Sequence, residues 1–264
     1  MELIEVKAAA LVVLLGLAYA GGVLPLRVSK SPRADVLFSL SNAFAGGLFL
    51  AVGLIHMLGD AGVGLDAAEI GTDYPVELLL ATGGFLAVLL LEAVVGGRVR
   101  ASLGDAYQPG KATSQAGLRA RLLAVILSVH SLIAGIAIGA EITVAATVAI
   151  LIALVSHKGP EGYALGISLY EAGRNRSQLI RTVMAYAAMT PIGIVIGSVL
   201  SEALSGQADL IFESVFDALA AGTFTYLATF GVLKEEFSAP EMLGRKYLCA
   251  VAGAALIAVI TIWA

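Results

Sequence analysis

Residues 122–167 read LLAVILSVHSLIAGIAIGAEITVAATVAILIALVSHKGPEGYALGI. They contain two apolar runs, over 122–140 and 143–167, that are interrupted by very few ionisable residues. A helix rises about 1.5 Å per residue, so about 20 apolar residues are enough to cross the roughly 30 Å hydrocarbon core of a bilayer. The sequence therefore predicts two successive membrane helices in this region.

The rest of the chain repeats this pattern. Of the 264 residues, 59% are hydrophobic and 14% are charged, whereas soluble chains are about 45–50% apolar and about 25% charged. The mean hydropathy is +0.92. We therefore predict an all-α integral membrane protein, in which residues 1–264 form a single transmembrane domain because the loops are too short for another. The eight expected helices span about 9–26, 37–58, 76–96, 122–140, 143–167, 182–204, 213–232 and 246–263.

The basic residues indicate how these helices are oriented. All Lys and Arg residues except Lys7 and Lys158 fall in the loops after the first, third, fifth and seventh helices. The positive-inside rule places those loops in the cytoplasm and both termini outside. The loop after the second helix and the region between the sixth and seventh are acidic instead. This acidity either follows from the exclusion of basic residues or attracts cations to the outer mouth of a pathway.

A few polar residues interrupt the predicted membrane helices. Each ionisable side chain there costs about 2.5–3.5 kcal/mol on insertion scales, so its presence needs a reason. His130 and Ser131 lie in the fourth helix, and His157, Lys158 and Glu161 lie in the fifth. His157 and Glu161 are four residues apart and project from one helix face. Imidazole nitrogen and carboxylate oxygen together suit zinc, iron or manganese.

Pro160 stands directly before Glu161. Its ring cannot donate a backbone hydrogen bond and crowds the carbonyl of Ser156, so we expect the fifth helix to bend beside the two candidate ligands. The freed carbonyl oxygen is an additional candidate ligand. The alternative is structural: His157 and Glu161 pair with each other, with Lys158 or with Ser131 and hold the helices together.

These segments resemble the ZIP family of divalent metal transporters. The resemblance rests first on His-Ser-Leu-Ile-Ala-Gly-Ile-Ala-Ile-Gly at 130–139 and His-Lys-Gly-Pro-Glu-Gly-Tyr-Ala-Leu-Gly at 157–166. Gly-Leu-Ile-His-Met-Leu at 53–58, Thr-Pro-Ile-Gly-Ile-Val-Ile-Gly at 190–197 and Ala-Ala-Gly-Thr-Phe at 220–224 are similar to the second, sixth and seventh helices of that family. The resemblance covers essentially the whole chain.

The resemblance implies a 3+2+3 arrangement of helices, a homodimer, and uptake of zinc or a related divalent metal toward the cytosol. The metal site would lie midway across the membrane on the fourth and fifth helices, and His130, His157 and Glu161 match metal-ligand positions. His56 matches a histidine of the second helix, and Asp60 lies one turn nearer the outside. These two residues form either part of the pathway for incoming metal or, in the structural reading, a packed or interfacial histidine with its neighbour.

The sequence departs from the family pattern at several possible ligand positions. Where some relatives carry an acid or amide, this chain has Ala134, Ser131, Lys158 and Thr190. Each replacement removes a possible ligand of a second metal, so we predict one metal site, with the Lys158 ammonium in place of the neighbouring cation. The segment 97–121 is expected to be a flexible cytoplasmic loop, and it contains no histidine.

Two other functional classes compete with a transporter. A passive metal-selective channel could use the same polar residues. An intramembrane zinc hydrolase is less well supported, because the chain has no His-Glu-x-x-His or comparable catalytic pattern, so we expect no enzyme activity and no catalytic residues. The expected partners are a divalent metal (zinc, or iron, manganese or cadmium) and the lipid bilayer of a plasma or inner membrane, and not nucleic acid.

Overall fold

The computed structural model describes residues 2–69, 74–103, 113–200 and 207–262, and within these ranges the chain is helical with no strand. The helices are α1 (Leu3–Val23), α2 (Pro25–Val28), α3 (Ala34–Ala51), the π-helix η1 (Val52–Met57), α4 (Leu58–Ala67), α5 (Val76–Leu103), α6 (Thr113–Ala140), α7 (Val144–Glu171), α8 (Arg176–Ala187), α9 (Met189–Leu200), α10 (Gln207–Tyr226), the π-helix η3 (Leu227–Leu233), α11 (Lys234–Ser238) and α12 (Leu243–Ile260).

Eight of these helices, or runs of consecutive helices, are long and apolar enough to cross a membrane. The predicted all-α membrane fold with eight transmembrane helices is therefore confirmed. Several helices run past the apolar segments; the second span, for example, continues through η1 and α4 to Ala67. Hydropathy marks only the part of a helix that suits lipid, whereas backbone hydrogen bonding continues into the polar region beyond it.

The segment 97–121 is more helical than we expected. α5 continues to Leu103 and α6 begins at Thr113, so both ends of the expected loop are helical, and its centre lies outside the described residues.

The sixth span is divided at Ala188 into α8 and α9. Pro191 explains the division, because it has no N–H to donate to the carbonyl of Ala187.

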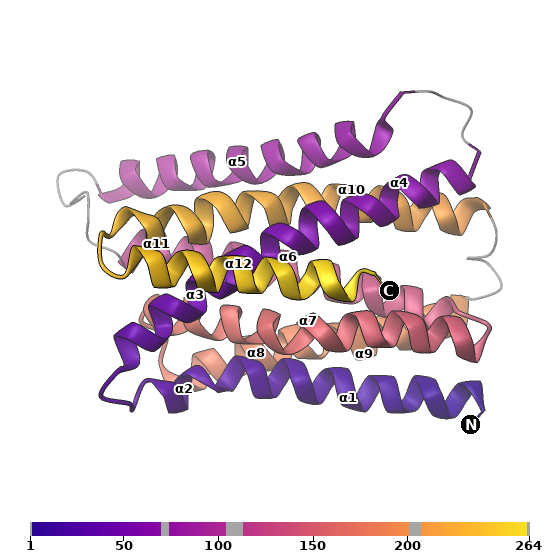
Figure 1. The fold of residues 1–264 in the computed structure, drawn as a ribbon, viewed down its shortest axis with the longest axis horizontal. Coiled ribbons are helices and arrows are strands. Elements are labelled where there is room, and N and C mark those ends of the chain that lie inside the picture. The colour runs from indigo at the N-terminus through magenta and orange to yellow at the C-terminus, as the bar shows by residue number, and fades with distance from the viewer. Residues whose placement is uncertain (1, 70–73, 104–112, 201–206, 263–264) are drawn as a thin grey trace.

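The spans form two groups of helices. In the first group, α1 packs along α7 and α8, and α6 packs along α9. In the second, α3 packs along α12, and α10 packs along α5 and α4. Figure 1 shows the second group above the first, and α6 and α7 contact helices of the second group. The start of α1 and the end of α12 lie toward the same end of the molecule (Figure 1).

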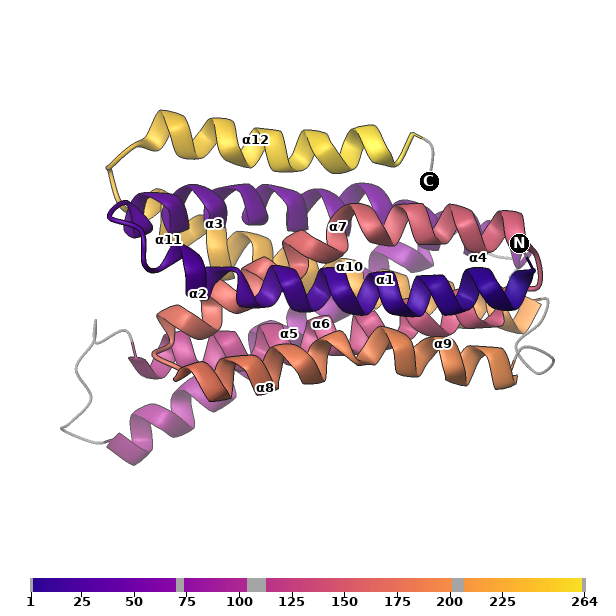
Figure 2. The ribbon, with the colours of Figure 1, turned by 90° about the horizontal axis from the view of Figure 1, so that it is seen from below.

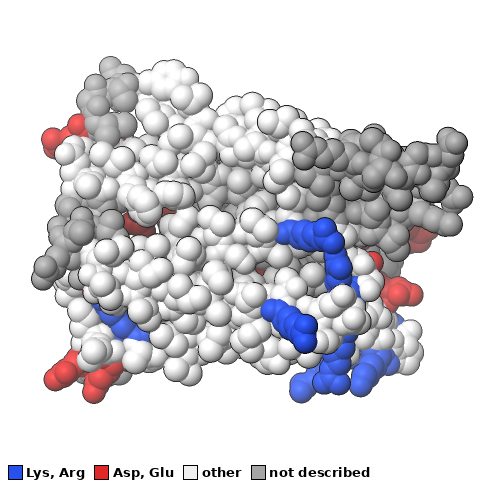
Figure 3. Space-filling model, turned by 180° about the vertical axis from the view of Figure 1, so that it is seen from behind, with Lys and Arg blue, Asp and Glu red and all other residues white. Residues whose placement is uncertain are grey.

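Basic side chains gather at the opposite end of the molecule. α2, α11 and the beginning of α8 lie there (Figure 1), and they carry Arg27, Lys234 and Arg176. The face seen in Figure 3 has most of its Lys and Arg side chains at this end, and some of them reach onto the apolar face. We call this end the basic end, and the end with the start of α1 the acidic end.

Glycines let the backbones of α6 and α9 touch. A Cβ atom at Gly135 would collide with the carbonyl oxygen of Thr190, and one at Gly139 would collide with that of Ile194. Gly193 and Gly197 face them across the interface. Small residues at four-residue spacing allow this close approach, which replaces hydrophobic burial as the main source of helix association in lipid.

Gly135→Ala is expected to destabilise the protein by about 1–3 kcal/mol, because the added methyl group meets backbone that cannot move aside. The matched control is Gly83→Ala on α5, where no heavy atom lies within 4 Å of the new methyl group. Thermal unfolding of both variants in detergent tests the prediction. Equal midpoints for the two variants would contradict the close contact between α6 and α9.

Candidate metal centre

Three potential metal ligands meet between α6 and α7, where these helices face the second group. His130 comes from α6, and His157 and Glu161 come from α7. Glu161 Oε1 lies 3.7 Å from His130 Nε2 and 3.6 Å from His157 Nε2. All three side chains are buried, and one ligand atom from each lies within 4.8 Å of the others. We call these residues the His–His–Glu cluster.

The facing atoms of the cluster lack ordinary partners. His130 Nε2, His157 Nε2 and Glu161 Oε1 are buried and make no hydrogen bond to the described residues. A buried polar atom without a partner costs about 1–3 kcal/mol, which a bound ion would remove. Two ligands of a tetrahedral zinc, each about 2.1 Å from the metal, lie about 3.4 Å apart. The two separations from Glu161 Oε1 to the imidazole nitrogens are close to this value.

The second carboxylate oxygen of Glu161, Oε2, accepts two hydrogen bonds. Glu161 Oε2 accepts hydrogen bonds from the Tyr186 hydroxyl at 2.9 Å and from Lys158 Nζ at 3.3 Å. The carboxylate is therefore oriented so that Oε1 faces the two imidazoles. Hydrogen bonds of this kind fix the direction of a ligand group and are typical of the surroundings of metal sites.

The Lys158 side chain is completely buried beside the cluster. Its ammonium donates to Ser131 Oγ at 2.7 Å and lies 5.3 Å from the centre of the Tyr186 ring. A buried ammonium is tolerated only with such compensation by a carboxylate, a hydroxyl and an aromatic face. Lys158 thus lies beside the cluster and contacts both Ser131 and Glu161.

Sequence reasoning did not identify Tyr186. This residue lies on α8, and its hydroxyl touches Glu161 because α8 packs against α7. No local signal in the sequence marked this residue, because tyrosine is common in membrane helices. Thr190 is buried at the start of α9, and its hydroxyl makes no hydrogen bond to the described residues.

Pro160 lies inside α7, whose ribbon changes direction along its course (Figure 2).

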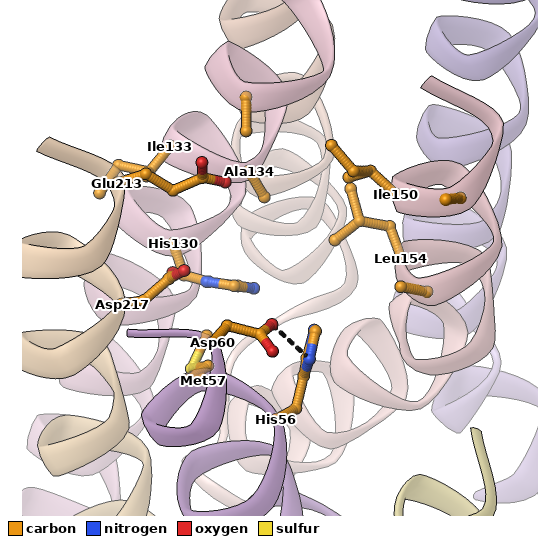
Figure 4. A pocket seen from close by; sticks show the side chains of 13 residues that line it. His56, Met57, Asp60, His130, Ile133, Ala134, Ile150, Leu154, Glu213 and Asp217 are labelled. Atoms are coloured by element: carbon orange, nitrogen blue, oxygen red, sulfur yellow. Dashed lines mark ion pairs between the residues drawn. The ribbon is translucent and has the colours of Figure 1, made fainter. Parts of the chain in front are cut away.

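A cavity of about 140 Å³ lies on the acidic-end side of the cluster. His130 forms part of its wall, and His56, Asp60, Glu213 and Asp217 line it from the second group of helices (Figure 4). His56 Nδ1 lies 2.8 Å from Asp60 Oδ2, and the rings of His56 and His157 are 5.9 Å apart. His56 and Asp60 therefore lie between the cluster and the acidic end.

His56 sits in the π-helix η1. One π-helical turn inside a longer helix is uncommon and often occurs at functional sites. His56 and Asp60, four residues apart, both line the cavity. On the basic-end side of the cluster, Leu127 and Leu165 are fully buried in one apolar core.

Comparisons with known proteins bear on this geometry. A family model described as ZIP Zinc transporter matches residues 4–106 and 101–261, which is nearly the whole chain. The chain belongs to the ZIP zinc transporter family. It is 29% identical to zinc transporter ZIP2 of Mus musculus, and the alignment covers 99% of each chain. It is 31% identical to zinc transporter 11 of Arabidopsis thaliana, over 99% of this chain and 86% of that protein.

A third relative, zinc transporter ZIP1 of Homo sapiens, is 28% identical over 96% of this chain and 90% of that protein. These relatives are named as transporters and not as enzymes. Membership in the ZIP family confirms the resemblance recognised from the sequence and supports divalent metal transport. The buried His–His–Glu cluster is compatible with that activity.

Proposed function

We propose that this ZIP-family protein carries zinc toward the cytosol through the His–His–Glu cluster. The observation that carries the proposal is the convergence of three buried ligand atoms that lack hydrogen-bond partners among the described residues. Two imidazoles and one carboxylate suit zinc, and a water, the substrate's own ligand, would complete four-coordination. Iron, manganese and cadmium also accept these donors, so zinc as the preferred cargo rests on the names of the relatives.

The cavity and the charge distribution support a direction for this movement. By the positive-inside rule the basic end faces the cytoplasm, so the acidic end and both termini face outward. Metal would be attracted by the acidic cavity, pass His56 and Asp60, and exchange its waters for the cluster. Leu127 and Leu165 fill the opposite side, so release to the cytosol requires the packing between helices to rearrange.

Uptake of radioactive zinc into proteoliposomes tests the proposal. We expect saturable uptake, and we expect His157→Ala to reduce it to the level of protein-free vesicles. Uptake that rises linearly with zinc concentration would indicate a channel and contradict the carrier. No uptake by the unaltered protein would contradict both. Competition with iron, manganese and cadmium in the same assay measures the preference for zinc.

Four further features stay predictions. Ser131, Lys158 and Thr190 are proposed to stand where a second metal site would otherwise be, and Pro160 is proposed to bend α7 beside the cluster. The homodimer and the location in a plasma or inner membrane follow from the resemblance. Crosslinking of the protein in its native membrane tests the dimer.

A further inference from the structure

Three arginines surround one cavity at the basic end of the first group of helices. The cavity has a volume of about 550 Å³ and lies between α6, α7 and α8. Arg121 lines it from α6, Arg174 from the connection between α7 and α8, and Arg181 from α8. Gln178 and Thr182 add an amide and a hydroxyl to its wall. We call this cavity the arginine pocket.

The positive charge of the arginine pocket is not balanced by any carboxylate among the described residues that line it. Its described lining contains no Asp or Glu. None of the ion pairs and side-chain hydrogen bonds found between described residues involves the guanidinium groups of Arg121, Arg174 or Arg181. Guanidinium groups that converge without a carboxylate form a fork-shaped donor array that matches the oxygens of a phosphate.

The inner wall of the arginine pocket is apolar and continues toward the membrane. Ala124, Val125 and Leu169 contribute to the lining. Val125 is 60% exposed, and Val129, one turn deeper on α6, is 48% exposed. Arg121, Val125 and Val129 follow one another at four-residue spacing and so share a helix face. This face is cationic where α6 leaves the membrane and apolar within it, which favours an amphiphilic ligand over a soluble anion.

We infer that the arginine pocket binds the phosphate headgroup of an anionic phospholipid from the cytoplasmic leaflet. The three guanidinium groups hold the phosphate, Gln178 and Thr182 contact the polar headgroup, and an acyl chain follows Val125 and Val129. Basic pockets between membrane helices on the cytoplasmic side recognise anionic lipids in this way. The arginine pocket and the His–His–Glu cluster share α6. On this helix, His130 follows Arg121 by nine residues, or about 14 Å along the helix axis.

Native mass spectrometry of the detergent-purified full chain tests this inference. The probes are phosphatidylglycerol and phosphatidylcholine of equal chain length, titrated separately. We expect phosphatidylglycerol to bind more tightly, and each Arg→Gln substitution at Arg121, Arg174 or Arg181 to weaken it about fivefold. The three substitutions together should weaken it about 100-fold. The matched control is Arg33→Gln, an exposed arginine at the same end that does not line the pocket.

Three results would overturn the inference: equal affinity for the two lipids, equal binding by the unaltered and substituted proteins, or displacement of phosphatidylglycerol by millimolar inorganic phosphate. The last result would identify a soluble anion as the ligand. The single substitutions keep the test valid if the triple variant fails to fold, which size-exclusion chromatography detects. Because lipid binding is measured without zinc, this test and the transport assay can fail independently.

Discussion

Glu161→Gln is expected to abolish saturable zinc uptake and to weaken zinc binding about 100-fold. The substitution keeps the shape of the side chain but removes the charge of the one carboxylate in the His–His–Glu cluster. Zinc sites with four protein ligands bind with about 10–16 kcal/mol, or about 3 kcal/mol for each ligand, and this corresponds to about two orders of magnitude in Kd. Isothermal titration with zinc in detergent measures the loss.

The matched control is Glu171→Gln at the end of the same helix. Glu171 accepts a hydrogen bond from Asn42 at 3.2 Å and lies outside the cluster, so zinc affinity should not change. Glu161→Gln also leaves the Lys158 ammonium without its charged partner, so the thermal stability of both variants has to be compared. Unchanged zinc affinity in a folded Glu161→Gln protein would show that the cluster does not bind the metal.

Lys158→Ala is expected to raise the number of bound metal ions from one to two per chain. Removal of the side chain empties a buried space beside Glu161 Oε2, Ser131 Oγ and the Tyr186 ring. The freed carboxylate oxygen then attracts a second cation in place of the ammonium. Elemental analysis of protein equilibrated with excess zinc and desalted measures the stoichiometry. A stoichiometry of one would rule out this role for Lys158.

Lys246→Ala is the control for the loss of a buried lysine. Lys246 is also buried, lies at the basic end, and its ammonium is 3.4 Å from Glu236 Oε2. Both variants remove a buried ammonium from an ion pair. Breaking a buried pair costs up to about 3–5 kcal/mol, so both should unfold at lower temperature. Only Lys158→Ala should gain a metal ion, and a gain in both variants would indicate binding unrelated to the cluster.

The fold was largely predictable because lipid imposes a simple length requirement. Eight apolar segments predicted eight spans, and the described residues contain eight helices, or runs of helices, that are long and apolar enough to cross a membrane. The division at Ala188 could have been inferred from Pro191, but the π-helices η1 and η3 could not. A π-helical turn depends on how neighbouring helices fit together, and glycines such as Gly53, which packs against the carbonyl of Ala221, act only through that tertiary contact.

The candidate site was predictable where a residue is costly in the membrane. His130, His157, Lys158 and Glu161 were found because ionisable groups in hydrocarbon need compensation. Tyr186 is amphipathic and ordinary in a membrane helix, so nothing local marked it as the hydrogen-bond donor to Glu161. The sequence also left open whether Lys158 pairs with Glu161 or stands apart, and only the packing of α6 against α7 shows that it contacts both Ser131 and Glu161.

The ammonium of Lys158 lies 3.3 Å from Glu161 Oε2. With neutral imidazoles, the metal-free cluster and this lysine together carry no net charge, and the zinc-loaded cluster carries two positive charges. Moving one elementary charge across a membrane potential of 100 mV changes its free energy by about 2.3 kcal/mol. In the proposed carrier, an inside-negative voltage therefore pulls the loaded site inward but leaves the return of the unloaded site unopposed.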